Sequence, residues 1–435
     1  MPVGAFAGGR NWGYDGAHVA APNAHYGTPD ELRALVDRAH GLGLSVLIDV
    51  VYNHVGPEGS YLAEFGPYTA DAHKNLWGDG FDYARPEVRA WMLDTCLAWL
   101  TEYRMDGLRV DAVHAIVDHS SPHVLAELTS RARALPPLPG DAPGFVPLLV
   151  AETDKNDAVM YDAQGFDTCW SDDFHHALHA CLTGEITGYY VDFGEIETLA
   201  RVIADGWKRG PHPERAKEFA ATRFIVSTQT HDQIGNRARG ERLEHLVGAP
   251  AARLAAVALL AATPGVPMLF QGEEHAASTP FLYFTSHEDE RLIESVRVGR
   301  RREFAEQGFA WPADVPDPNH EHSFVRSKLD PSERRREPHA AMGRLYRDLI
   351  ALRKVQPGLG AVGKESCSVR TEDGAIVIDR SSSCRVVLNL GKRPLAIGSG
   401  WRAVLCSEDH RYGGAGDCAR EVPARAAAVL VPARG

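Results

Sequence analysis

One arrangement recurs along this chain and strongly limits how it can fold. A short apolar, β-branched segment ends in an acidic residue, and sequence with helical character follows. Three of these ends carry Asp111, Glu152 and Asp232. Strands that are apolar throughout are typical of parallel sheets covered by helices on both faces. Acidic groups at the carboxyl ends of parallel barrel strands share one face of the barrel, so we expect these three to lie together.

Six segments have the composition of buried parallel strands, namely residues 46–52, 107–113, 147–152, 167–171, 224–229 and 267–271. Helices are predicted between most of them, including 86–103, and again at 339–354. The clearest helix start is at Thr28, which can cap, with Pro29 at the first helical position and Glu31 completing a capping box. The helix that follows has an apolar face formed by Leu32, Leu35, Val36, Ala39 and Leu42.

Two further regions depart from the strand and helix pattern. Residues 53–83 are polar and aromatic and too long for an ordinary connection, which predicts a binding loop. After residue 360 short alternating runs replace the helical pattern and indicate antiparallel strands. We therefore expect an α/β fold with a TIM-type (β/α)8 barrel domain at 1–358 and a small antiparallel β domain at 359–435.

Composition excludes several classes of partner. The net charge of −12, without a long basic run, argues against nucleic acid and anionic membranes and favours a neutral small-molecule partner. Seven irregularly spaced cysteines without a Cys-x-x-Cys pair predict reduced thiols, not a disulfide framework or a zinc cage. The start lacks a signal-peptide pattern, and no run of 18 or more apolar residues follows. These features predict a soluble cytoplasmic protein.

Two of the strand-end acids suit the cleavage of a glycosidic bond. Retaining cleavage needs one carboxylate to attack the anomeric carbon and one carboxylic acid to protonate the leaving oxygen, about 5 Å apart. Asp111 suits the first role, because Arg109 precedes it by two residues and shares its strand face, where it can keep the carboxylate ionised. Glu152 suits the second, since its apolar approach at 148–151 is expected to raise its pKa. Asp232, with His231, would bind hydroxyls and stabilise positive charge on the sugar.

Each of these residues also has a simpler interpretation. A single aspartate at a strand end more often caps a helix, and only the combination of three favours catalysis. His54 is a further polar group at a strand end, while His114 can equally pack under the rim of the barrel. Trp12, Trp77 and Trp170 can be core residues or sugar-stacking platforms. A metal role for Asp49, Asn53 or residues 172–179 is weakly indicated, because carboxylate chemistry needs no metal, and no cofactor is predicted.

At these residues the chain resembles the α-amylase superfamily of glycoside hydrolases, in four short signature regions at 49–54, 107–114, 150–152 and 230–232. The resemblance implies a (β/α)8 barrel. It also implies Asp111 as nucleophile, Glu152 as general acid and base, and Asp232 as the residue that stabilises the transition state.

Longer segments resemble one subfamily, which hydrolyses the α-1,4 bond beside a terminal trehalose unit and releases trehalose. They are 10–16, 108–116, 172–176, 231–236, 272–284 and 326–330. The implied substrate is maltooligosyltrehalose, with a functional link to the synthase that makes it. The sugar-contacting residues implied by these segments or by their place at strand ends are Tyr14, His54, Arg109, His114, Asp172, Asp173, Phe174, His175, His176, Gln229, Thr230 and His231.

Two positions depart from the subfamily, and part of the barrel is unaccounted for. His275 stands where tryptophan is expected and Val110 where leucine is usual. The resemblance places two barrel strands and a β domain before the segment at 11–14, and residues 1–3 resemble the tail of the second strand. We therefore expect a truncated, poorly active barrel. The alternative functions are an α-amylase, a glycogen-branching enzyme of the same superfamily, and an inactive glucan-binding remnant.

Overall fold

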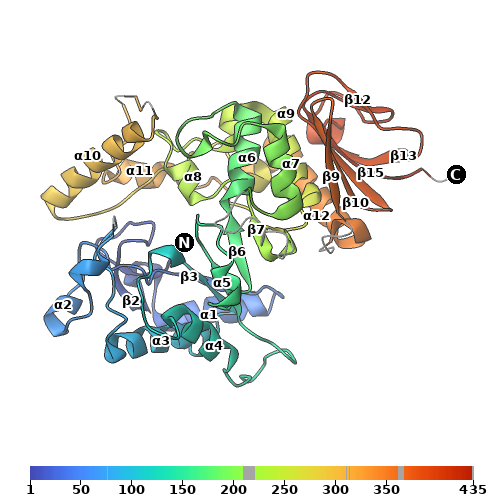
Figure 1. The fold of residues 1–435 in the computed structure, drawn as a ribbon. Helices are drawn as coiled ribbons and strands as arrows, with labels where there is room; N and C mark the ends of the chain where they lie inside the picture. The colour runs from blue at the N-terminus through green and yellow to red at the C-terminus, as the bar shows by residue number, and fades with distance from the viewer. Residues whose placement is uncertain (76, 209–220, 310, 313, 361–366, 434–435) are drawn as a thin grey trace. The chain divides into compact units, whose positions relative to one another are not determined.

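The structure is a computed structural model of the 435-residue chain (Figure 1). It describes residues 1–75, 77–208, 221–309, 311–312, 314–360 and 367–433. The chain divides into two compact units. The first unit consists of Met1–Trp170 with Phe284–Val296, and the second consists of Ser171–Tyr283 with Arg297–Gly435.

Parallel strands form the centre of the first unit. β3 (Leu47–Val50), β4 (Gly107–Val110) and β5 (Leu148–Ala151) pair in that order, and β6 (Thr168–Ser171) pairs with β5. The connections include α3 (Pro86–Thr101) and α4 (Val124–Arg133). All four residues of β4 are buried, as expected for an interior strand covered on both faces. Four predicted strands are thus confirmed, with each strand slightly shorter than the apolar segment.

The N-terminal segment differs from the prediction. Residues 1–3, expected as the tail of a strand, have no regular secondary structure. An antiparallel ribbon of β1 (Gly4–Phe6) and β2 (Gly16–Pro22) follows instead. The predicted capping box is confirmed at the start of α1 (Pro29–His40). Most of the apolar face predicted for that helix is not buried. Val36 is buried, at 1 % exposed, but Leu35 is 61 % exposed.

The second unit holds the remaining parallel strands and the longest helices. β7 (Phe224–Val226) pairs in parallel with β8 (Val266–Pro267), and the Met268 N–H still donates to the Val226 carbonyl at 2.8 Å. The helices are α6 (Asp172–Thr183), α7 (Ile196–Asp205), α8 (His231–Gly235), α9 (Leu243–Val257), α11 (Glu321–Arg326) and α12 (His339–Val355). The other helices of the chain are α2 (Leu62–Phe65), α5 (Val159–Asp162) and α10 (Glu290–Glu306).

Six parallel strands are therefore present in the described residues, although β8 shares only Pro267 with the segment predicted at 267–271, and a closed barrel of the expected class needs eight. The structure confirms the α/β class with parallel strands. It does not confirm the closed barrel.

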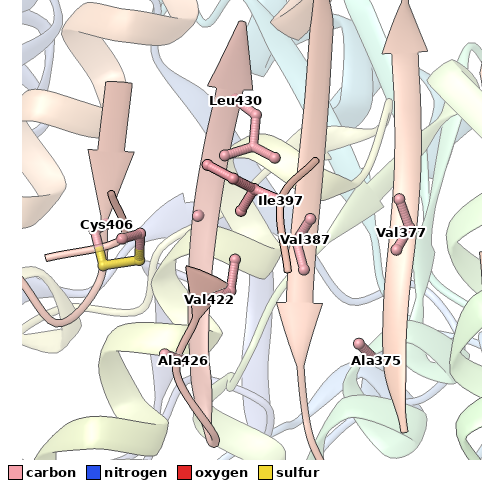
Figure 2. Close-up of a cluster of buried hydrophobic side chains, with 10 residues drawn as sticks. Ala375, Val377, Val387, Ile397, Cys406, Val422, Ala426 and Leu430 are labelled. Carbon is pink, nitrogen blue, oxygen red and sulfur yellow. A yellow bond between two sulfur atoms is a disulfide. The ribbon is translucent and has the colours of Figure 1, made fainter. Parts of the chain in front are cut away.

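The C-terminal residues form the predicted antiparallel sheet. Its strand order is β13-β15-β11-β10-β9, with bounds Trp401–Cys406, Ala426–Pro432, Cys384–Asn389, Ala375–Ser381 and Ser368–Glu372. A separate pair joins β12 (Leu395–Ala396) and β14 (Glu421–Val422). Alternate residues such as Ala375 and Val377 face a shared apolar cluster with Val387 and Leu430 (Figure 2).

A disulfide at the edge of this cluster corrects the cysteine prediction. Cys406 and Cys418 are bonded, and the bond is drawn in yellow in Figure 2. The other five cysteines are free. Irregular spacing along the chain did not reveal the pair. The segment after β13 returns to the end of that strand and places the two Cα atoms 5.6 Å apart.

Helix α9 continues as a π-helical turn at Ala258–Ala262 and forms the core of the second unit. Residues 243–262 have a mean hydropathy of 1.6, enough by length and composition to cross a membrane, but 61 % of that apolar window is buried within the protein. The backbone also leaves helical geometry at Gly248, where φ is 73°, just before Pro250. These properties fit a core helix.

Two arginines satisfy the carbonyl groups at the end of this helix. Arg353 donates to the carbonyls of Leu260 (2.9 Å) and Gly265 (3.0 Å). Arg380, which has no exposed surface, donates to those of Ala262 (3.4 Å), Gly358 (3.1 Å) and Gly360 (2.8 Å). The last carbonyls of a helix have no partner within the helix, so these cations replace the missing donors and complement the helix dipole.

Replacing Arg380 with methionine should therefore destabilise the protein. The variant leaves the buried carbonyls of Ala262 and Gly358 and the half-buried one of Gly360 without this donor, which we expect to cost on the order of 3 kcal/mol. Urea unfolding of wild type and Arg380→Met measures the difference in the free energy of unfolding, which is read from the two midpoints if the m-values are equal. Arg402→Met, at an exposed position of β13, is the matched control and should stay within about 0.5 kcal/mol of wild type. Equal midpoints for Arg380→Met and wild type would contradict the capping role.

Candidate active site

The first two acidic residues directly follow neighbouring strands of the first unit. In the parallel ladder Asp49, Arg109 and Val150 are aligned on β3, β4 and β5. The Asp111 N–H donates to the Val50 carbonyl at 2.9 Å, and the Glu152 N–H donates to the Val110 carbonyl at 3.1 Å. The ladder thus continues to both acidic residues and fixes their backbones at the same edge of the sheet.

A buried guanidinium joins the carboxylates at this edge. Arg109 Nη1 lies 2.7 Å from Asp49 Oδ1 and 2.7 Å from Asp111 Oδ1, and Arg109 Nη2 lies 3.6 Å from Glu152 Oε2. Its Cζ is 4.3 Å from the ring centre of Trp170, a cation–π distance. The predicted contact between Arg109 and Asp111 is confirmed.

Burial and charge oppose each other at this cluster. Burial would lower the pKa of Arg109, but the surrounding carboxylates, Asp49 foremost, hold that pKa well above its usual value. Burial likewise raises the pKa of Asp49, but the Arg109 guanidinium, together with the N-terminal ammonium and the Tyr14 hydroxyl, lowers the pKa overall. Asp49 and Arg109 therefore form a buried ion pair, and a fixed positive charge lies beside Asp111.

A chain of hydrogen bonds holds the other side of Asp111. Asn53 Nδ2 donates to Asp111 Oδ2 at 3.0 Å, and the Asn53 side-chain oxygen contacts His54 Nδ1. His54 Nε2 lies 3.0 Å from the Tyr14 carbonyl, and the Tyr14 hydroxyl donates to Asp49 at 2.8 Å. Burial keeps the pKa of His54 below its usual value despite the nearby charge of Asp111. Asn53 and Asp49 lie within the 49–54 signature region, and the sequence indicated them only weakly, as metal ligands, and not as partners of Asp111 and Arg109.

The surroundings of Glu152 differ from those predicted. Its carboxylate accepts a hydrogen bond from the Ala112 N–H at 2.6 Å, besides lying near Arg109. Ala112 has a left-handed backbone, with φ 41°, in the turn that follows β4. The strand that leads to Glu152 is apolar, but the carboxylate itself has polar neighbours.

The remaining candidates of the first unit have separate environments. Trp12 is buried and Trp170 lies beneath Arg109, whereas Trp77 is 48 % exposed with its ring 6.0 Å from that of His54. His114 Nε2 is 3.7 Å from Asp154 Oδ1, and partial burial lowers the pKa of His114. Of the three tryptophans, Trp77 is therefore the most exposed, while Trp170 is half-buried.

The third acidic residue belongs to the second unit, in the short helix α8. Thr230 caps this helix by accepting from the Asp232 N–H at 3.2 Å, while its own N–H donates to Gln233 at 2.9 Å. The Asp232 side chain is 47 % exposed and lies 3.2 Å from Nε2 of the buried His231. Gln229 is buried, and its side-chain oxygen accepts from the Leu243 N–H at 3.0 Å. Asp232 thus has an accessible carboxylate on a firmly capped turn.

The predicted sugar-contacting run at 172–176 is only partly accessible. Asp172 and His176 are half-buried and lie four residues apart on one face of α6, where the His176 ring contacts those of Tyr189 and Phe193. Asp173, Phe174 and His175 are buried. Phe174 has no exposed surface and belongs to the core, and the Asp173 carboxylate accepts from the Lys208 N–H at 2.5 Å. The contact predicted for Phe174 is therefore corrected to a packing role.

A buried carboxyl group supports the loop between β7 and α8. Glu273 accepts hydrogen bonds from the Tyr346 hydroxyl (2.9 Å), the Phe270 N–H (3.1 Å) and the Thr228 hydroxyl. Burial raises the pKa of Glu273 to about 7, with the nearby Glu244 acting in the same direction. Glu273 was not predicted from the sequence, because nothing in its local pattern signals burial. His275, which replaces the expected tryptophan, is also buried and contacts Glu274 at 2.9 Å.

Comparisons with known proteins agree with this geometry. Residues 6–77 match the family model for the alpha-amylase catalytic domain. A crystal structure named as an alpha amylase of Salmonella typhimurium has a TM-score of 0.86 and 34 % identity, over 99 % of this chain and 75 % of that one. The strand-end carboxylates and these matches define the chain as an α-amylase-family glycoside hydrolase.

Curated relatives narrow the assignment. Malto-oligosyltrehalose trehalohydrolase of Rhizobium sp. (strain M-11) is 42 % identical over 94 % of this chain and 71 % of that protein. The Mycobacterium tuberculosis (strain H37Rv) protein of the same name is 40 % identical over 99 % of this chain and 76 % of that protein. The chain therefore belongs to the malto-oligosyltrehalose trehalohydrolase family.

The raised pKa of Glu273 predicts a specific dependence of stability on pH. Between the ordinary value of 4.5 and about 7, the folded state retains a proton that the unfolded state loses. This retained proton contributes to the free energy of unfolding in full below pH 4.5. The contribution declines as the pH rises to about 7 and is lost above that value. The total change is roughly 3 kcal/mol. Unfolding free energies of wild type and Glu273→Gln between pH 4.5 and 8 test this, because the variant should remove that decline.

The matched control for that series is Glu64→Gln, at an exposed position of α2, which should keep the wild-type pH profile. Parallel profiles for wild type and Glu273→Gln would exclude Glu273 as the source of the decline.

Proposed function

We propose that the chain is a retaining hydrolase that cleaves the α-1,4-glucosidic bond next to the terminal trehalose of maltooligosyltrehalose and releases trehalose. The observation that carries the proposal is the pair of acidic residues at adjacent strand ends, both within reach of Arg109. Retaining glycosidases require such a pair, one member as a nucleophile and the other as a proton donor. The relatives named malto-oligosyltrehalose trehalohydrolase support the choice of substrate.

Asp111 acts as the nucleophile in this proposal. Arg109 and Asn53 hold its two carboxylate oxygens at 2.7 Å and 3.0 Å and orient the group for attack on the anomeric carbon. Glu152 protonates the glycosidic oxygen as the bond breaks, and trehalose leaves. The maltooligosyl group then remains bound to Asp111 as an ester. Glu152 next removes a proton from water, which attacks the same carbon and frees Asp111.

Asp232 is assigned to the sugar ring whose charge increases in the transition state. The motif resemblance and the accessible carboxylate support this role, and His231 at 3.2 Å orients it. Tyr14 is assigned to stacking on the sugar at the cleavage point, with Asp172 and His176 as further contacts. We place the reaction in the cytoplasm, downstream of a synthase that makes maltooligosyltrehalose.

Replacing Asp111 with asparagine should abolish turnover and spare binding. The substitution removes the attacking charge at nearly constant shape, so we expect trehalose release to fall by at least about 10⁴-fold. Chromatography of the products from maltooligosyltrehalose measures release, and calorimetry measures the Kd, which should change little. Asp94→Asn, exposed on α3, is the matched control and should keep wild-type activity.

The wild-type products distinguish the alternatives. Reducing maltose from a maltooligosaccharide of equal length would indicate an α-amylase, and new branch points would indicate a branching enzyme. Sugar binding without any turnover would indicate a glucan-binding remnant. An active Asp111→Asn variant would refute the nucleophile assignment.

A further inference from the structure

The second unit contains a cavity that the proposed mechanism does not use. Its volume is about 140 Å³, and it lies between α8, α10 and the residues after α10. A volume of this size holds roughly ten water-sized groups, which suits a ligand as large as one hexose ring. The lining residues are Gly235, Arg237, Ala238, Leu282, Tyr283, Arg297, Arg300, Arg301, Trp311, Val315, Pro316, Asp317 and Pro318.

Flat side chains form one wall of this cavity. The Cζ atom of Arg300 lies 4.1 Å from the ring centre of Tyr283 and 5.5 Å from that of Trp311. Trp311 stacks on Phe304 with the ring centres 4.6 Å apart and the planes 14° from parallel. Phe304 is buried, so Trp311 is fixed from behind while its own side chain remains half-buried. Rigid aromatic surfaces of this kind bind the apolar faces of sugar rings.

Polar groups accompany this wall, and four arginines with one carboxylate, Asp317, are among the lining residues. Arg300 donates to the Asn236 side chain at 3.2 Å and to the Gly235 carbonyl at 3.1 Å, which leaves other N–H groups of its five for a ligand. Among the described residues no carboxylate lies within ion-pair distance of Arg300. Arg297 is paired with Asp317 at 2.5 Å and Arg237 with Glu185 at 2.9 Å. Two of the four lining arginines are thus neutralised by carboxylates, and the remaining donors next to flat rings suit a polyhydroxy ligand.

The cavity adjoins the helix that carries Asp232. Gly235 ends α8 three residues after Asp232, and the charge of Asp232 raises the pKa of Arg300 against the dominant lowering by burial. Arg237 on the same side is held through Glu185, which also contacts His179 Nε2 at 2.8 Å. Arg300 therefore lines the cavity and also contacts the end of the helix that carries Asp232.

We propose that this cavity binds one glucosyl unit of the oligosaccharide substrate, with Trp311 as the stacking surface and Arg300 as the hydrogen-bond donor. The proposal deepens the proposed function and rests on it for the identity of the sugar. The unit comes either from the trehalose end or from the glucan chain, and both present the same ring chemistry.

Sugar binding is tested in the background of Asp111→Asn, in which turnover is removed. Calorimetric titrations with trehalose and with maltotriose show which source of the glucosyl unit binds. Trp311→Ala should weaken the affinity for that sugar by about tenfold, the effect expected for loss of an aromatic contact. Trp311→Phe should restore most of it, and Arg300→Lys should weaken it because the planar donor pattern is lost. Arg302→Lys, exposed on the same helix and outside the cavity, should have no effect.

The outcomes separate this proposal from the proposed function. Unchanged affinity for both sugars in Trp311→Ala and in Arg300→Lys would overturn the subsite, as would displacement of the bound sugar by inorganic phosphate. If Trp311→Ala does not fold, as judged by its Tm, Arg300→Lys and Trp311→Phe decide the matter. In the otherwise wild-type enzyme, Trp311→Ala should raise KM for maltooligosyltrehalose more than it lowers kcat. A wild type that releases no trehalose, together with weaker sugar binding in Trp311→Ala, would refute only the proposed function.

Discussion

The candidate active site depends on one buried cation, the guanidinium of Arg109. Arg109 lies on β4, which is flanked by β3 and β5. Asp49 is its partner on β3, and the next residue, Val110, accepts the backbone hydrogen bond from Glu152, which follows β5. A buried arginine without partners would be strongly unfavourable, and here the carboxylates around it compensate for the loss of water. The same guanidinium contacts both acidic groups, Asp111 at 2.7 Å and Glu152 at 3.6 Å, and its positive charge opposes their mutual repulsion.

The parallel ladder gives this cluster its rigidity. Hydrogen bonds between strands continue up to the backbones of Asp111 and Glu152, so neither acidic residue depends on a flexible loop for its position. Asn53 and the left-handed turn at Ala112 then direct the carboxylate oxygens. A catalytic group that must be placed to within about half an ångström benefits from this support by regular structure.

The sequence was sufficient to predict the features that depend on residues close together in the chain. The six strands, the capping box of α1 and the contact between Arg109 and Asp111 follow from composition and from the two-residue period of a strand. The core role of Phe174 and the raised pKa of Glu273 were not predictable in this way, because each depends on residues distant in sequence. The disulfide joins cysteines 12 residues apart, and the spacing of the seven cysteines does not single out that pair. The cavity beside α8 is a further example, since Tyr283, Arg300 and Trp311 meet only in the folded unit.

The histidines of α6 have a consequence for behaviour in acid. His175 and His179 lie ring on ring, His179 stacks on Tyr190, and burial lowers the pKa of His176 to about 3 and that of His175 well below its usual value. Near neutral pH they therefore act as uncharged aromatic rings and do not sense pH. When the chain unfolds they become ordinary bases, so their support for the fold is complete above about pH 6.5 and is lost as acidity increases. Glu273 has the opposite dependence. Mild acid thus increases the contribution of Glu273 to the stability of the second unit and decreases the contribution of these histidines.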